Sequence, residues 1–339
     1  MDRRFVLGLA LALLSGASFS TSGSFAKGLL EAGWTPGAAV TARVGLAALV
    51  LLVPAVVAMR GRWHTLRRGW PQIVLFGLVA VAGCQLAYFF AVQRLTVGVA
   101  LLLEYLGIIL IVGWLWLRHG HRPRPLTVAG AGLAVAGLAL VLDVFGGIQI
   151  DLVGVLFGLA AAMGLAVYFI VSADETHQVP PITLATGGLA VGALVLLLAG
   201  AVGVLPMRWS TEHVVLAGTQ VPMWLDAVLL AVVAGALAYF SGIAATRRLG
   251  SKLASFVGLT EVMFAVLFAW LLLGELPAPI QLAGGVLILA GVVAVKLDER
   301  PRPAVAEPEP RTEAQPAADP VPAATPGDVA SPDDVGAPA

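Results

Sequence analysis

The sequence has a single cysteine and little charge. Cys84 is alone among 339 residues, which excludes an intramolecular disulfide and a metal site built from several cysteines. Charged residues make up 12% of the chain, about half the share found in soluble domains. Twenty basic and twenty acidic residues cancel, so the net charge favours neither a nucleic-acid partner nor an acidic one.

Catalytic groups are also few. No histidine stands beside a candidate nucleophile inside an apolar block, and the pair His119 and His121 lacks a third metal ligand. The sequence contains no Gly-Lys phosphate-binding loop. We therefore expect no enzyme activity, no metal, no cofactor and no direct use of ATP.

Apolar side chains dominate what is present, at 59% of the residues with a mean hydropathy of +0.93. They form blocks with almost no charge, of the length that crosses a bilayer as a helix. We predict an all-α membrane protein whose partner is the lipid bilayer. The ten predicted transmembrane helices cover 5–26, 38–59, 72–93, 97–117, 126–143, 152–173, 182–204, 223–245, 252–273 and 280–297.

The first block has a second interpretation. Arg3 and Arg4 precede it and small residues end it, as in a secretory signal peptide. Its run of 22 residues is long for the apolar core of such a segment. We interpret it as the first transmembrane helix.

Basic residues predict the orientation. With both termini on one side, fifteen Lys and Arg residues fall in the loops of that side, and only Lys27, Arg94 and Arg208 fall in the loops of the other. Basic loops face the cytoplasm. We expect a multi-pass protein of the cell membrane with cytoplasmic N and C termini.

The end of the chain differs from the rest. Ten of the 21 prolines lie from Pro301 onward, together with many acidic residues and almost no large apolar side chain. Such a composition cannot bury enough apolar surface to fold. We predict a disordered, Pro/Ala-rich acidic tail over 300–339.

The two halves of the chain resemble each other. Ala87-Tyr88-Phe89 recurs as Ala238-Tyr239-Phe240, and Leu102-Leu103-Glu104 as Leu259-Thr260-Glu261, at separations of 151 and 157 positions. We predict two five-helix repeats, 1–147 and 148–299. An odd number of helices in each repeat inverts the second repeat relative to the first, as in many secondary transporters, which bind substrate near the midplane.

Several of these motifs carry a family resemblance. The segment from Arg248 to Val295, with Leu271-Leu272-Leu273-Gly274-Glu275-Leu276, resembles the second repeat of EamA-type proteins in the drug/metabolite transporter superfamily. Leu103-Glu104-Tyr105 resembles the first repeat of amino acid exporters in particular. The resemblance covers about residues 5 to 297. It implies a plasma-membrane carrier, commonly an exporter of amino acids, other metabolites or drugs, with helices 5 and 10 peripheral to a central cavity.

Glu104, Glu261 and Arg43 lie inside predicted spans, away from the span ends, where charge is costly and usually functional. Glu104 is roughly 10 Å into the fourth span and Glu261 roughly 14 Å into the ninth, at 1.5 Å per residue. They could bind a substrate amine or a proton, or be neutral groups hydrogen-bonded for packing. Arg43 could pair with Glu104 or extend to the outer headgroups.

Serines and tyrosines complete the candidate binding site. Ser15, Ser18 and Ser22 share one face of the first span and could line a polar cavity or simply permit close packing. Tyr88, Tyr105, Tyr168 and Tyr239 all lie within spans. They could contact substrate or pack between helices.

Glycines on the fifth and tenth spans lie seven residues apart, as Gly130 and Gly137 and as Gly284 and Gly291. Small faces let helices approach closely, within one chain or in a homodimer. Together these features predict a secondary transporter that exports a small-molecule substrate, such as an amino acid, by alternating access. The alternative is a non-transporting membrane receptor or scaffold with the same fold.

Overall fold

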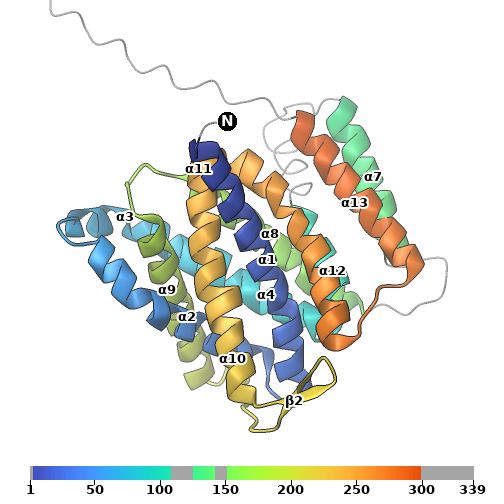
Figure 1. The fold of residues 1–339 in the computed structure, drawn as a ribbon, viewed down its shortest axis with the longest axis horizontal. Helices are drawn as coiled ribbons and strands as arrows, with labels where there is room; N and C mark the ends of the chain where they lie inside the picture. The colour runs from blue at the N-terminus through green and yellow to red at the C-terminus, as the bar shows by residue number, and fades with distance from the viewer. Residues whose placement is uncertain (1–2, 108–124, 142–150, 299–339) are drawn as a thin grey trace, which may run out of the picture. The chain divides into compact units, whose positions relative to one another are not determined.

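The computed structural model describes residues 3–107, 125–141 and 151–298. Several predictions lie outside these residues: the end of the fourth span, His119, His121 and the tail. Figure 1 shows a bundle of helices running between two ends. The helices are α1 (Arg3–Glu31), α2 (Pro36–Ala58), α3 (Trp63–Leu75), η1 (Phe76–Gly83), α4 (Cys84–Val92), α5 (Val97–Tyr105), α7 (Pro125–Val141), α8 (Leu152–Ala173), α9 (Pro181–Ala201), α10 (Met223–Ala231), η2 (Val232–Leu237), α11 (Ala238–Gly258), α12 (Thr260–Leu273) and α13 (Pro279–Asp298).

Six helical stretches in the described part are long and apolar enough to cross a membrane, including the continuous stretches over 63–92 and 223–250. Shorter apolar helices cover 125–140, 260–273 and 279–294. An all-α membrane protein is therefore supported. The count of ten spans and the side of the termini stay predictions.

The predicted boundaries were wrong in three places. α1 continues to Glu31, and the third helical stretch begins at Trp63 rather than at 72. The chain at 223–273 divides differently: α11 continues through a kink at Gly250 (φ 77°) to Gly258 before α12 begins. Charge scarcity marks the part of a helix that lies in lipid, but polar and basic residues outside the lipid can extend the same helix.

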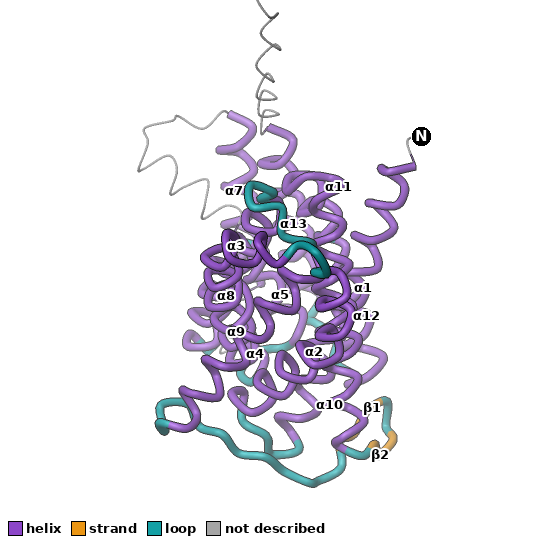
Figure 2. Tube along the Cα trace, turned by 90° about the vertical axis from the view of Figure 1, so that its left-hand side faces the viewer, coloured by secondary structure: helices purple, strands orange, loops and turns teal. Residues whose placement is uncertain are grey.

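A hairpin, β1 (Val214–Leu216) and β2 (Thr219–Val221), closes one end of the bundle (Figure 2). Ala217 and Gly218 both have positive φ, 50° and 73°, as a two-residue type I′ turn requires. The hairpin is an exception to the all-helical prediction. We call this the hairpin end; it is also where α1 ends and α2 begins.

Two π-helical segments interrupt the α-helical stretches of the bundle. η1 lies between α3 and α4, and η2 lies between α10 and α11, just before the repeated Ala-Tyr-Phe motifs. The α-helical hydrogen-bond pattern also breaks at Leu106, after α5, and at Leu259, between α11 and α12, although both residues keep right-handed helical dihedrals. These two positions are 153 residues apart. Wide turns and interruptions leave carbonyls without their usual helical partners, so they are places where side chains can bind backbone.

α7 and α13 lie side by side (Figure 1) and pack through their glycines. A Cβ built on Gly137 would lie 2.5 Å from the Gly284 carbonyl oxygen, and one on Gly291 would lie 2.4 Å from that of Gly130. Any larger residue would push the helices apart. These glycines therefore serve packing within the chain, and the homodimer stays a prediction without support from them.

Candidate functional site

A cavity lies between α1, α2, α4, α5, α8, α11 and α12. Its volume open to water centres is about 50 Å³, room for a few waters at about 10–15 Å³ each. Its polar or aromatic lining residues are Ser15, Phe19, Ser22, Arg43, Cys84, Gln85, Tyr88, Glu104, Tyr168, Phe169, Tyr239, Thr246 and Glu261. Eight of the ten candidate residues named from the sequence are among them. Tyr105 and Ser18 are not.

Arg43 is the cation of the cavity and has no exposed surface. Its Nη1 donates to Gln85 Oε1, and its Nη2 donates to the Ala234 carbonyl oxygen on η2. The guanidinium carbon lies 5.8 Å from the ring centroids of Phe19 and Phe89, within cation–π range. Both predictions for Arg43 were wrong: it forms no ion pair with Glu104 among the described residues, and its burial keeps it from any headgroup.

Glu104 is buried, with 6% of its surface exposed. The Cys84 thiol lies 3.4 Å from both Glu104 Oε1 and the Ala161 carbonyl oxygen. A thiol is a weak donor, so the carboxyl group has only a modest partner. The sequence offered Cys84 only as a lone cysteine, and nothing in its spacing indicated this contact.

Glu261 lies on α12, one residue past its start. The Tyr105 hydroxyl lies 2.6 Å from the Gly258 carbonyl oxygen and 3.1 Å from Glu261 Oε2. Since a phenol has one hydrogen to donate, the two acceptors share it. Tyr105 thus joins the two helix interruptions, because it precedes Leu106 on α5 and contacts the residue before Leu259.

Tyr168 and Tyr239 form an aromatic wall with Phe19 and Phe76. Ring centroids lie 4.9 Å apart for Phe19 and Tyr239, 5.9 Å for Tyr168 and Tyr239, and 5.7 Å for Phe76 and Tyr168. Such edge-to-face and tilted pairs are favourable beyond their burial. The Tyr239 hydroxyl also donates to the Ala80 carbonyl oxygen of η1 at 3.4 Å. Packing and cavity lining are therefore combined in these residues.

The predicted serine face divides between two roles. Ser15 lines the cavity and donates to the Ala238 carbonyl oxygen at 2.9 Å, whereas the Ser22 hydroxyl lines the cavity with no partner among the described residues. Ser18 is buried outside the lining. The helical spacing predicted that the three serines share one face of α1. It did not predict which hydroxyls pack within the fold, or that the Ser22 hydroxyl lacks a partner among the described residues.

Two buried polar residues were missed. Gln85 lines the cavity and accepts from Arg43, and an amide inside an apolar block was the available signal. Asp226, on α10, is fully buried, and both its carboxyl oxygens lack a hydrogen-bond partner in the described part of the chain. It stands near the start of the predicted span over 223–245.

Contacts between distant segments close the hairpin end. Lys27, at the end of α1, forms an ion pair with Glu275, which also accepts from the Val97 backbone N–H of α5 at 3.4 Å. The hairpin packs on α1, since a Cβ on Gly28 would lie 2.5 Å from Val214 Cγ1. Lys27, which the sequence offered only as one of three basic residues on the less basic side, therefore joins two distant segments of the fold.

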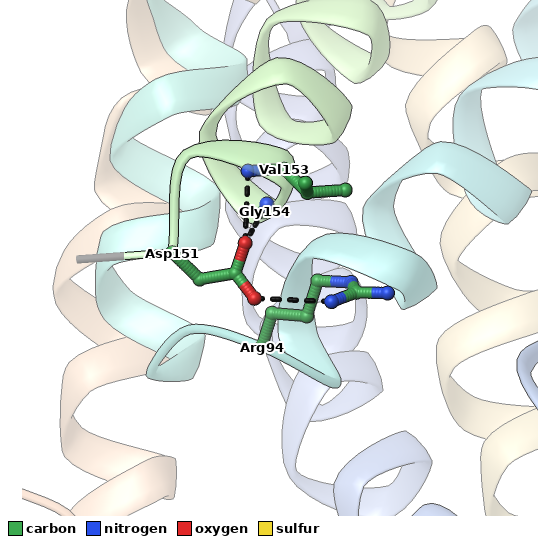
Figure 3. A network of polar contacts seen from close by, with 4 residues as sticks. All are labelled: Arg94, Asp151, Val153 and Gly154. Atoms are coloured by element: carbon green, nitrogen blue, oxygen red, sulfur yellow. Dashed lines mark hydrogen bonds and ion pairs between the residues drawn. The ribbon is translucent and has the colours of Figure 1, made fainter.

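A second ion pair at this end lies on the surface (Figure 3). Arg94 Nη1 donates to Asp151 Oδ2 at 3.0 Å, and the backbone N–H groups of Val153 and Gly154 donate to Oδ1. Asp151 is thus the N-cap of α8. The Gly154 N–H, followed by Arg94, lowers the pKa of this carboxyl below its ordinary value.

Known proteins resemble this chain over most of its length. It is 27% identical to the threonine/homoserine exporter RhtA of Escherichia coli (strain K12) over 86% of this chain and 90% of that protein. It is 29% identical to a probable terminal-alkyne amino-acid exporter of Streptantibioticus cattleyicolor over 67% and 73%. An uncharacterized transporter of Archaeoglobus fulgidus is 26% identical over 66% and 77%.

One solved crystal structure covers 88% of this chain and 97% of its own chain with a TM-score of 0.55 at 22% identity, which supports the fold alone. The model of the EamA-like transporter family matches residues 6–143 and 152–297. These matches agree with the expectation of a carrier rather than an enzyme. The chain belongs to the EamA-like transporter family.

Proposed function

We propose that the protein is a secondary transporter that exports a small metabolite such as an amino acid. One observation carries the proposal: charged side chains of both signs, the buried Arg43 and Glu104 and the half-buried Glu261, line one cavity inside a member of a transporter family. A receptor or scaffold gains little from charges held at such a cost. The names of two relatives, both amino acid exporters, support the same substrate class.

Transport proceeds by alternating access between the two halves. The hairpin end is closed by the Lys27–Glu275 ion pair and the hairpin, while the cavity lining extends the other way to Ala12 and Ala254. The hairpin end faces outside in our proposal, because its loops carry only three basic residues. The described conformation is then closed to the outside.

Glu261 is the proposed proton-coupling group. It lies at a helix interruption next to the cavity, and the Tyr105 hydroxyl can follow a change in its charge by donating to either of two acceptors. A carboxyl group that loads and releases a proton in each cycle couples export to the proton gradient. ATP has no role in this scheme.

The test is counterflow in liposomes that contain the full-length protein. Labelled threonine, homoserine and a panel of other amino acids would be offered outside vesicles loaded with the unlabelled compound. We expect accumulation of at least one of them, with an enhanced rate under an imposed proton gradient. Specific binding without exchange across the whole panel would instead favour the receptor or scaffold.

The orientation has its own test. Gln220→Cys, on β2, should react with an impermeant thiol reagent in intact cells, and Gly61→Cys, between α2 and α3, should react only after the membrane is opened. Both changes are made in a Cys84→Ser background. The reverse pattern would overturn the proposed direction of the bundle.

A further inference from the structure

We propose that the cavity recognises a zwitterion through two separate poles, with Arg43 binding the carboxylate and Glu104 binding the ammonium group. The inference rests on the proposed function and deepens it, because it states which chemical groups a transported substrate must carry. It also states which residue binds each group.

The positive pole lacks a counter-ion. Arg43 is fully buried, and no carboxylate lies within 4 Å of it among the described residues. Its two hydrogen-bonded nitrogens face neutral oxygens, and its Nε has no acceptor in the described part of the chain. A buried charge is costly unless it is compensated. A carboxylate compensates it best, since its two oxygens match the donor geometry of a guanidinium.

The negative pole is equally incomplete. Glu104 lines the same cavity, and its contact with the Cys84 thiol leaves room for a stronger donor. No Lys or Arg lies within 4 Å of it in the described residues. An ammonium group brings three N–H donors and a charge of the opposite sign.

One helix contacts both poles. Cys84, which contacts Glu104, and Gln85, which binds Arg43, are consecutive residues of α4. Arg43 and Glu104 themselves do not pair within 4 Å. An α-amino acid carries its carboxylate and its ammonium group on one carbon, so one small molecule can engage both poles. A monovalent ligand satisfies only one.

The remaining wall limits the side chain of such a ligand. Phe19, Tyr168 and Tyr239 are packed edge to face, so a bulky side chain would have to displace these rings. The unpartnered Ser22 hydroxyl offers one further hydrogen bond. A small amino acid with a short polar side chain fits this description.

Competition measurements can separate the two poles. Counterflow of labelled threonine would be competed with threonine, with threoninol, which lacks the carboxylate, and with 3-hydroxybutyrate, which lacks the amine. In the wild type both analogues should compete about tenfold to hundredfold more weakly, as the loss of a charge-assisted hydrogen bond implies. Arg43→Gln should abolish the advantage of threonine over threoninol. Glu104→Gln should abolish its advantage over 3-hydroxybutyrate.

A second variant distinguishes a loss of substrate binding from a loss of folding. Gln85→Glu places a permanent partner beside Arg43, so we expect a higher melting temperature together with at least a tenfold loss of threonine affinity. Misfolding cannot produce that combination. Gln220→Glu, the same change at an exposed position of β2, should alter neither quantity.

The outcomes distinguish this inference from the proposed function. If the wild type exchanges threonine but both analogues compete as well as threonine does, the two-pole inference is wrong while export stands. The inference also fails if Gln85→Glu leaves threonine affinity unchanged. If no amino acid of the panel is exchanged, the proposed function itself fails.

Discussion

The helices α3 to α5 and the helices α10 to α12 have similar backbones and different polar side chains. Each set has a π-helical segment followed by an Ala-Tyr-Phe motif, and each has an interruption beside a glutamate. Each π-helical segment also offers a carbonyl to the opposite half: Ala234 accepts from Arg43, and Ala80 accepts from Tyr239. The backbone irregularities are therefore among the points at which the halves bind each other.

The side chains at corresponding positions have diverged. Gln85 corresponds to Ala236 when the Ala-Tyr-Phe motifs are aligned, and Tyr105 corresponds to Val262 when the glutamates are aligned. The first set therefore binds Arg43 through a side chain, whereas the second set binds it through the Ala234 carbonyl. Only the first set has a tyrosine next to its glutamate, and this Tyr105 reaches across to Gly258 and Glu261. The two sets therefore share their backbone features, whereas the polar side chains that they contribute to the cavity differ. This difference makes the two sides of the cavity chemically unlike.

The largest expected effect is a difference between the Glu104→Gln and Glu261→Gln variants in substrate binding and in the pH dependence of transport. Glu104→Gln should raise the half-saturation concentration for threonine at least tenfold, because it removes the charge that faces the ammonium group. Glu261→Gln should leave binding within about twofold and flatten the dependence of transport on pH between about 5 and 8. Both variants would be measured in the same liposomes over that range.

The inequality rests on the different partners of the two carboxyl groups: Glu104 contacts the weakly donating Cys84 thiol, whereas Glu261 contacts the Tyr105 hydroxyl. Identical effects of the two substitutions on binding and on pH dependence would mean that the halves act alike.

The next effect concerns the link between the two interruptions. Tyr105→Phe removes one hydroxyl without changing packing, and we expect a fivefold to tenfold lower transport rate, from the loss of about 1 kcal/mol of hydrogen bonding. Because Tyr105 acts through Glu261, its effect should be much smaller in a Glu261→Gln background.

A matched control is Tyr105→Phe combined with Lys27→Met, whose site is at the hairpin end. Those two effects should add. Full additivity of Tyr105→Phe with Glu261→Gln would show that the hydroxyl merely supports the Gly258 carbonyl.

A smaller effect tests the closure of the hairpin end, which joins α1 to the segment after α12. Lys27→Glu should open this end, with lower thermal stability of a few degrees and faster reaction of the Cys84 thiol with a reagent added on that side. Adding Glu275→Lys should restore the pair. A double variant no better than the single one would contradict a charge-based closure.

The smallest effect is expected at Asp151 (Figure 3). Asn is also a good N-cap residue, so Asp151→Asn removes only the charge, and we expect a melting temperature within a few degrees of wild type. The folded-state pKa of Asp151 is lowered. Its stabilising contribution is therefore present above the unfolded pKa of about 3.9 and is lost as the pH falls through the lower folded value. Melting curves on both sides of that range would detect the loss.

The sequence predicted the apolar helices, the family and most of the cavity lining, because each depends on charge scarcity or on local motifs. It did not predict the partners of Arg43 and Lys27, since Gln85 and Glu275 are 42 and 248 positions away. A pairing at that distance depends on the tertiary arrangement. The hairpin was missed for another reason: Ala217-Gly218 between two short β-branched runs is a recognisable turn signal, but a search for spans ignores it.

The position of the lone cysteine makes it a chemical reporter of the cavity. Cys84 lies in the cavity lining against Glu104, and no other thiol exists in the chain. Any mass shift produced by a thiol reagent on the unmodified protein therefore records entry of that reagent into the cavity and nothing else. The protein carries its own site-specific reporter: the rate of alkylation measures how often the cavity is open, and the protection given by a candidate compound measures its occupancy.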